Sequence, residues 1–421
     1  MKPNDKGWFK SYLLSRSESI LSDYQQEQLD ADRERNIYRW IQPSGLMYGH
    51  PVSVPFQDAE SIRKYNDDEK LKLLMAESFL MSMYATEKDK ENLQQQLLNA
   101  PGKVIQFYES LFPDLNVSSR TFFGKEKADH DQAEALIDKR LKVSGSLRRN
   151  FWSSFFTNSL LFLDVYFFFQ YLETHASIDS QDLRGQLNHI RMIIVKVIAA
   201  AAHANDKIEK EEREIFNFFL TSAKLPADKK SEARSFFEKG APLDELKLPE
   251  MQSWLLRKYV LELAVLTLFS DRIMEDREKK FVLKLANMLS LDPEDRDSSI
   301  IAIESFVLQN WDNIHFLQGR AQYQIVSERL LGTVRSMLEQ NKNSLAKEFR
   351  ESKELMQLLS KYKKEGLTEQ EKEKARNQIY DILKTIPAFV LIALPGSFIT
   401  FPILLKVLPK NVLPSAFSEA E

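Results

Sequence analysis

Residues 385–405 read T-I-P-A-F-V-L-I-A-L-P-G-S-F-I-T-F-P-I-L-L, a run of twenty-one residues without a charged side chain. As a helix this run would cover about 30 Å, the thickness of the hydrocarbon core of a bilayer. Its length and apolar character predict a membrane-spanning segment, and the alternative is a helix buried in a protein core. We therefore expect the C-terminal end to hold the chain in a membrane.

Four residues of this stretch interrupt regular helix geometry. Pro387, Pro395 and Pro402 lack the amide hydrogen that a helix needs, and Gly396 also disfavours a helix. In a membrane such residues are tolerated where neighbouring helices or hydroxyl side chains satisfy the freed carbonyl groups. The expected segment is therefore a proline-kinked span or a re-entrant hairpin.

Basic residues are distributed unequally around the stretch. Only Lys406 and Lys410 follow it, before an acidic end. By the positive-inside rule, the bulk of the chain is expected on the cytoplasmic side of an inner membrane, where the lysines could also contact anionic lipid. The basic residues that precede the stretch are Lys361, Lys363, Lys364, Lys372, Lys374, Arg376 and Lys384.

Five prolines form a wider pattern across residues 386–417. An Ile-Pro opening is followed by a mid-span proline, a later proline, a lysine, a Pro-x-Asn turn and a closing L-P-S-A-F. This order resembles the membrane segment of the LETM family, named for leucine zipper, EF-hand and transmembrane. The positions that carry the resemblance are Ile386, Pro387, Pro395, Pro402, Lys406, Pro409, Asn411, Leu413, Pro414 and Phe417.

The resemblance implies a bacterial, biofilm-associated type of LETM-like protein, with membrane lipid and the ribosome as expected partners and a role in ion homeostasis. Two features depart from the family pattern. Phe398 stands where mitochondrial members usually carry a glutamate, and only four residues follow Phe417. Ion exchange normally requires an ionisable group at membrane depth. Exchange by this segment alone is therefore not expected.

The composition is that of an ordinary globular protein, with 43% hydrophobic and 28% charged residues among 421. The net charge of −3 disfavours a nucleic-acid binder that relies on a global positive field. The absence of cysteine excludes disulfides and thiolate metal sites. The opening residues do not resemble a secretory signal. Few glycines and many Leu, Glu, Lys and Gln segments predict an all-α fold.

Residues 1–145 are expected to form an N-terminal helical region, broken by Pro and Gly between Gln42 and Pro55. Residues 146–185 contain a phenylalanine-rich apolar helix, Phe151 to Leu172. As a membrane span it would bury Asp164, which disfavours that interpretation against a soluble core or partner-facing helix. If it did enter the membrane, Asp164 would be the one carboxylate placed for ion coupling.

Residues 186–310 contain an internal repeat with a period of sixty-five residues. Val195–Leu220 and Val260–Leu285 each predict an apolar helix, a polar turn and a second, amphipathic helix that begins with acidic residues. This order resembles the TerB-like helical fold of tellurite-resistance proteins. The acidic residues of the first copy offer hard oxygen ligands for a divalent cation, or they cap the helix, which we favour because the second copy lacks most of them. They are Asn205, Asp206, Glu209 and Glu212.

Residues 311–384 predict charged amphipathic helices. Leu345, Phe349 and Leu359 recur at steps typical of one helix face, which could pack on the repeats or form a short coiled coil. Thr368 and Glu371 are spaced as a capping box that opens the last of these helices. Residues 385–421 hold the LETM-like transmembrane segment and tail.

The sequence contains none of the common catalytic motifs, neither a phosphate-binding glycine loop nor a metal-binding histidine pair. We therefore expect no enzymatic activity and no cofactor, except for the divalent cation considered above. The leading hypothesis is a membrane-anchored helical scaffold, ribosome-associated or linked to envelope stress or biofilm. The alternative is a cation/proton transporter or its accessory subunit. The chain could also assemble with other membrane proteins or as a homo-oligomer.

Overall fold

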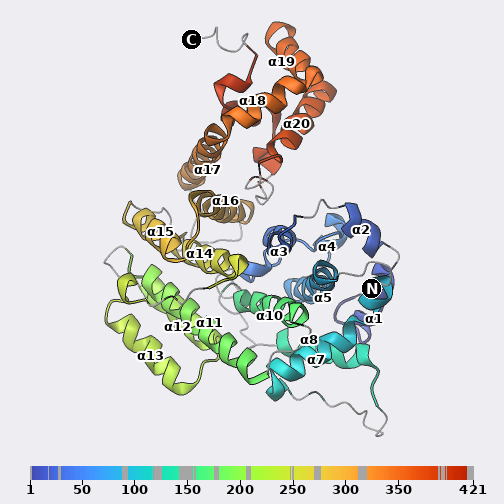
Figure 1. Ribbon diagram of the computed structural model, residues 1–421, viewed down its shortest axis with the longest axis vertical. Coiled ribbons are helices and arrows are strands. Elements are labelled where there is room, and N and C mark those ends of the chain that lie inside the picture. Colours follow the sequence, from blue (N-terminus) through green and yellow to red (C-terminus); the bar gives the residue numbers. More distant parts are fainter. Residues whose placement is uncertain are drawn as a thin grey trace. The chain divides into compact units, whose positions relative to one another are not determined.

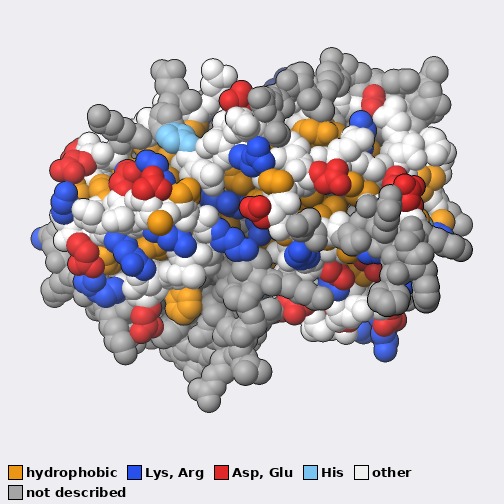
Figure 2. Space-filling view, turned by 90° about the horizontal axis from the view of Figure 1, so that it is seen from below, with side chains coloured by type: hydrophobic (Ala, Val, Ile, Leu, Met, Phe, Trp, Pro, Cys, Tyr) orange, Lys and Arg blue, Asp and Glu red, His pale blue; other side chains and the backbone are white. Residues whose placement is uncertain are grey.

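A computed structural model describes the chain in two units, Met1–Leu263 and Ala264–Glu421, each of which is considered by itself (Figure 1). The elements assigned in the described residues are helices, which confirms the all-α prediction. On the face drawn in Figure 2, acidic and basic side chains are interspersed, so neither sign of charge dominates there. The description covers all residues except 1, 18, 27–29, 88–92, 116, 118–125, 142–154, 156–157, 175–179, 205–209, 247, 249–250, 270–275, 312–319, 387–388, 390–393, 395 and 415–421.

The first unit is arranged around α5 (Asp67–Thr86), whose apolar side chains are buried on all sides. A capping box between Asn66 and Glu69 starts this helix, and α10 (Phe162–Glu173) packs along it. The other elements are α1 (Trp8–Arg16), α2 (Ile20–Gln26), α3 (Arg33–Ile41), η1 (Gln42–Ser44), η2 (Leu46–Tyr48), α4 (Ala59–Arg63), α6 (Leu93–Leu98), α7 (Ala100–Leu111), η3 (Pro113–Leu115), α8 (Asp129–Leu141), η4 (Ser159–Leu161), α11 (Ser180–Ala201), α12 (Lys210–Ser222), α13 (Ala227–Glu238), η5 (Leu243–Glu245) and the first ten residues of α14 (Trp254–Leu268).

The phenylalanine-rich stretch lies in the core of the first unit. Every residue from Phe162 to Phe169 is buried, and α10 contacts α5, α7 and α11. The interpretation of this stretch as a core helix is therefore confirmed for its described part. Residues 151–154 and 156–157 lie outside the description.

Both copies of the internal repeat have the predicted order of helix, connection and helix. The first copy consists of α11 and α12, and the second of α14 and α15 (Asp276–Met288). The likeness continues beyond the predicted copies, since Lys224 and Ser290 both adopt a positive φ, of 47° and 53°, before a buried leucine and the next helix. The repeat therefore spans three helices, although its resemblance to TerB-like proteins stays an expectation.

In the second unit, α17 (Arg320–Gln340) packs against α16 and begins a series of charged helices. α18 and α19 meet at Ser352, and α19 ends at Gly366, whose φ is 84°. The predicted capping box is confirmed: Thr368 accepts a hydrogen bond from the Glu371 amide, and Glu371 accepts one from the Thr368 amide. The remaining elements are α16 (Pro293–Gln309), α18 (Lys342–Glu351), α19 (Lys353–Glu365), α20 (Glu369–Leu383), η9 (Gly396–Phe398), α22 (Phe401–Val407) and η10 (Lys410–Val412).

The proline-kinked membrane span expected over Thr385–Leu405 is not found among the residues that the structure describes. The preceding helix ends at Leu383, and the described part of the stretch includes η9 and the short α22, which has Pro402 in its first turn. Proline is tolerated there because the first amides of a helix have no intrahelical acceptor, so it starts α22 instead of continuing a longer helix. Among the helices that the structure describes, none combines the length and the apolar character needed to cross a bilayer.

Candidate functional site

The C-terminal module, residues 335–414, folds as a small helical bundle. α22 packs against α17 and α20, and η10 packs against α18. In Figure 1 these helices form the orange and red part of the chain. The apolar stretch therefore supplies part of a protein core, which is the alternative that its sequence left open. The buried residues of the stretch and of the segment that follows it are Ile386, Phe389, Leu394, Phe398, Phe401, Leu404, Val407, Leu408 and Val412.

Three specific contacts fix the apolar stretch in the module. The rings of Tyr362 and Phe401 meet edge to face with their centroids 5.1 Å apart. Tyr380 meets Phe389 in the same way at 6.0 Å. Arg335 Nη2 donates a hydrogen bond of 2.8 Å to the Lys406 carbonyl. Aromatic pairs and a charge-assisted hydrogen bond together favour one defined position for α22 over a loosely collapsed segment.

The residues that carried the LETM resemblance have different environments. Pro409 and Pro414 are buried together with Ile386, whereas Leu413 is half-buried. The exposed positions are Gly396, Pro402, Lys406 and Asn411. Pro387, Pro395 and Phe417 lie outside the described residues.

The surface of the module is rich in charge. Residues 335–414 contain fourteen lysines and arginines and nine acidic residues, although the whole chain has a net charge of −3. Lys361 and Lys374 form ion pairs of 2.7 and 2.5 Å across the α19–α20 hairpin, with Glu371 and Glu354. The hydrogen bond from Lys361 and those from Thr368 lower the pKa of the Glu371 carboxyl to about 2.

Five exposed basic side chains of the module form neither an ion pair nor a hydrogen bond with a described residue: Lys347, Arg350, Lys353, Lys364 and Lys406. They lie on α18, on α19 and at the end of α22. Three acidic side chains lie among them without such a pair, namely Glu348, Glu351 and Glu365. The surface that is left for a partner is therefore moderately basic.

Asp164, the predicted ion-coupling residue, is fully buried in α10 and engaged in an ion pair. Arg140 Nε and Nη2 donate hydrogen bonds of 2.7 and 2.9 Å to the two carboxylate oxygens, and the Tyr108 hydroxyl donates a third of 3.2 Å. Burial, and then the Asp164 charge, raise the pKa of Tyr108. Both oxygens of Asp164 are thus occupied by protein donors, which is typical of a structural ion pair.

The candidate cation ligands of the first repeat cannot be placed. Asn205, Asp206 and Glu209 lie outside the description, as does the side chain of Glu212. In the part of the chain that the structure covers, no group of three His, Asp or Glu side chains is arranged to hold a metal ion. The cation site therefore stays a prediction.

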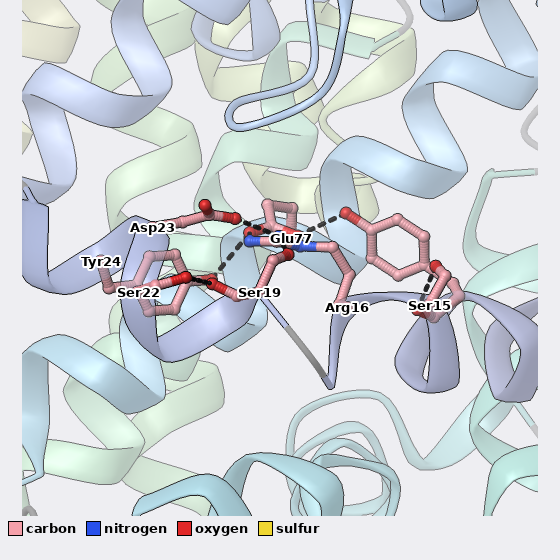
Figure 3. Close-up of polar contacts among 8 residues, drawn as sticks. Ser15, Arg16, Ser19, Ser22, Asp23, Tyr24 and Glu77 are labelled. Carbon is pink, nitrogen blue, oxygen red and sulfur yellow. Dashed lines mark hydrogen bonds and ion pairs between the residues drawn. The ribbon is translucent and has the colours of Figure 1, made fainter.

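A buried polar network in the first unit was missed by the sequence analysis. Glu77, in the middle of α5, accepts hydrogen bonds from the hydroxyl groups of Tyr12 and Tyr24 and from Arg16 Nε and Nη2 (Figure 3). Arg16 also pairs with Asp23 of α2. The signal for this network was one glutamate within the apolar run of α5. Because every member has a partner, the network joins α1, α2 and α5 as a structural unit.

A second buried glutamate, Glu262 of α14, is bound in a similar way. The hydroxyl groups of Tyr38 and Tyr48 donate to its two carboxylate oxygens, and Lys258 Nζ lies 3.7 Å away. Tyr38 belongs to α3 and Tyr48 to η2. The Pro- and Gly-containing segment between Gln42 and Pro55 is therefore held against α14 by a charged side chain in the core.

A cleft of about 790 Å³ in the first unit is bordered by α3, α10, α11 and the beginning of α14. Glu34 accepts a 2.8 Å hydrogen bond from the Leu255 amide at its edge, and partial burial raises the pKa of this carboxyl. His189 and Tyr166 also line the cleft. The volume of the cleft suits a small ligand. The Glu34 carboxylate, however, already binds the N-terminus of α14, where a negative charge stabilises the helix.

The C-terminal residues match a known protein family. Residues 367–421 match the family model described as LETM1-like, RBD, and the match begins at the capping box that opens α20. No curated protein and no solved structure gives a significant match to the chain. The part of the module that contains α20, α22 and η10 is thus similar to a known family, which supports a LETM1-like assignment of this C-terminal segment.

Proposed function

We propose that the protein is a LETM-like helical scaffold whose C-terminal module docks on the ribosome. The observation that carries the proposal is the match of residues 367–421 to a LETM1-like family whose description, RBD, stands for a ribosome-binding domain. The first unit and the repeats would then present helical surfaces to other partners. No enzymatic activity or cofactor forms part of the proposal.

The charge distribution of the module favours such a partner. The ribosome presents closely spaced phosphate groups, and basic side chains that replace condensed counterions give salt-dependent binding. The exposed cations Lys347, Arg350 and Lys353 lie within seven residues along α18 and the start of α19. They are available for such contacts because no described acidic residue pairs with them.

We also infer a place at the inner membrane, with the bulk of the chain on its cytoplasmic side. Two features support it, namely the charge-free run of twenty-one residues and the excess of lysine before that run. Entry into a bilayer would require the run to leave its contacts with α17 and α20. A link to envelope stress or biofilm is the wider role that the scaffold would serve.

The transporter alternative has weaker support. It depended on Asp164 as a carboxylate free to take up a proton or cation, and both Asp164 oxygens are bound by Arg140, with Tyr108 as a third donor. Release of this carboxylate would leave a buried arginine without its partner, which is strongly unfavourable. The scaffold function therefore accounts better for the residues that the structure brings together.

Co-sedimentation with purified 70S ribosomes, over a range of salt concentrations, tests the proposal. The triple variant Lys347→Glu, Arg350→Glu and Lys353→Glu should bind at least about tenfold more weakly and with a smaller salt dependence. The matched control reverses three exposed basic residues of the first unit that form no ion pair with a described residue, Lys10, Arg63 and Lys239. An equal loss of ribosome affinity in the module variant and in the control variant would indicate nonspecific attraction. Unchanged binding by the module variant would contradict docking through the module.

Membrane association is tested separately, by flotation of the full-length chain with vesicles of anionic lipid. The chain should float, and a chain that ends at Lys384 should stay at the bottom. Flotation of the truncated chain would place the membrane contact elsewhere. Because ribosome binding is measured without lipid, the two results can fail independently.

A further inference from the structure

The helix that carries two unpaired cations of the C-terminal module is amphipathic. Lys347 and Arg350 of α18 are exposed, whereas Leu345 and Phe349 of the same helix are fully buried. α18 packs against η10, in which Val412 is also buried. A short helix of this kind keeps its place mainly through the packing of its apolar face. The position of the two cations therefore depends on η10.

The short helix η10 is tied closely to the apolar stretch. Only Leu408 and Pro409 separate the end of α22 at Val407 from η10. This connection can span at most about 11 Å, whereas the hydrocarbon core of a bilayer is about 30 Å thick. If α22 entered that core, η10 would either leave α18 or hold α18 at the lipid surface. In both cases the exposed face of α18 would no longer be presented to another partner.

Specific contacts hold the segment in the module, and entry into lipid would break them. α22 packs against α17 and α20. The Phe401 ring meets the Tyr362 ring edge to face at 5.1 Å, and the Lys406 carbonyl accepts a 2.8 Å hydrogen bond from Arg335. The Lys406 side chain is itself one of the five unpaired cations of the module. The packing of α22 therefore places part of the basic surface directly.

We propose that ribosome docking and membrane entry of the apolar stretch exclude each other, so that α22 and η10 act as a switch with two positions. This inference rests on the function proposed above, because it takes the ribosome and lipid as the partners of the module. With the segment packed, α18 presents its cations to phosphate groups of the ribosome. With α22 in lipid, that face is displaced or covered. By thermodynamic linkage, each partner then weakens the binding of the other by the same factor.

Sedimentation of the full-length chain with 70S ribosomes through a sucrose cushion, with increasing amounts of vesicles of phosphatidylglycerol and phosphatidylcholine, tests the switch. The vesicles stay above the cushion, so chains that have moved to lipid are lost from the ribosome pellet. At saturating lipid the apparent ribosome affinity should fall by at least about tenfold. In the reverse experiment, ribosomes should weaken the flotation of the chain with vesicles by the same factor.

Substitutions that leave the charge unchanged separate the switch from a competition of two anionic partners for the same cations. Tyr362→Ala removes the ring that meets Phe401, so the lipid concentration that halves ribosome binding should fall by about threefold or more. Tyr380→Ala, which removes the contact with Phe389 from a different helix, should lower it in the same direction. Gln357→Ala, at an exposed position of α19, should leave it unchanged. Without vesicles, all three variants should bind ribosomes as the natural chain does.

The possible failures of the switch and of the proposed function can be told apart. Ribosome binding that vesicles leave unchanged would overturn the switch alone. Equal lipid concentrations for Tyr362→Ala and Gln357→Ala would also overturn it, because a purely electrostatic competition does not depend on the packing of α22. If the natural chain failed to bind ribosomes without vesicles, the proposed function would be contradicted, and the switch with it.

Discussion

The backbone of Gly49 lies directly against the amide nitrogen of Ser159, so there is no room for a β-carbon at this position. A β-carbon on Gly49 would lie 2.8 Å from the Asn158 carbonyl carbon and 2.9 Å from the Phe155 carbonyl oxygen. Gly49 also has a φ of 65°, which side chains other than glycine rarely adopt. This contact joins η2 to η4 and sets the position of α10, which follows η4 directly.

Gly49→Ala should destabilise the first unit by about 2–4 kcal/mol, because the overlap is with backbone atoms that cannot turn away. The measurement is the shift of the urea unfolding midpoint. Gly185→Ala is the matched control, since Gly185 lies within α11 with no atom within 4 Å of its added β-carbon. That variant should gain about 0.5–1 kcal/mol of stability. Equal effects of the two substitutions would contradict the close approach at Gly49.

Glu77→Leu should lower the free energy of unfolding by about 3–5 kcal/mol, because it leaves the buried Arg16 without its main partner. The double variant Glu77→Leu with Arg16→Met should recover much of that loss, since the charge that it leaves without a partner, on Asp23, is partly exposed to water. Glu60→Gln, at an exposed position of α4, should change stability by less than about 0.5 kcal/mol. Chemical unfolding followed by circular dichroism measures all three. Additive losses in the double variant would show that the two side chains are not coupled.

Local features of the fold could be predicted from the sequence, because they depend on residues close together in the chain. The capping box of Thr368 and Glu371 and the helix pairs of the repeat are of this kind. Partners of buried charges could not be predicted in this way. Asp164 and Arg140 are 24 residues apart on different helices, and Glu77 and Tyr12 are 65 apart. Such pairs become visible only when the helices are packed.

The C-terminal stretch shows a different limit of sequence analysis. An uncharged run of twenty-one residues can be buried equally well in the hydrocarbon core of a bilayer and in the core of a protein. Its prolines indicated interrupted helix, and the short α22 agrees with that indication. The choice between the two environments depends on Tyr362, Tyr380 and Arg335, which lie outside the run and supply its protein contacts.

The stability of the second unit should fall as pH rises between about 4.5 and 7. Burial raises the pKa of Glu304 from 4.5 to about 7, against the opposing effect of Arg329. In this range the folded protein holds a proton that the unfolded chain releases, so stability present below pH 4.5 is lost progressively. The largest loss from this group is about 3 kcal/mol.

Unfolding midpoints measured from pH 4 to pH 8 check this prediction. Glu304→Gln cannot titrate and should show a flatter profile, whereas Glu328→Gln, at an exposed position of α17, should keep the natural slope. The second Glu304 oxygen has no hydrogen-bond partner among the described residues, in agreement with a carboxyl that resists ionisation. A profile that is equally steep in Glu304→Gln would assign the pH dependence to another group.

Single introduced cysteines should report the environment of the apolar stretch, because the chain has no cysteine of its own. Leu404 is 1% exposed in α22, whereas Lys406, two residues later, is exposed. In detergent-free buffer, Leu404→Cys should react with a water-soluble maleimide at least about tenfold more slowly than Lys406→Cys, since labelling requires α22 to leave its place against α17 and α20. Equal rates would contradict the packed module. With anionic vesicles added, protection of both cysteines would indicate that the stretch has moved into lipid, and an unchanged ratio that it stays in the module.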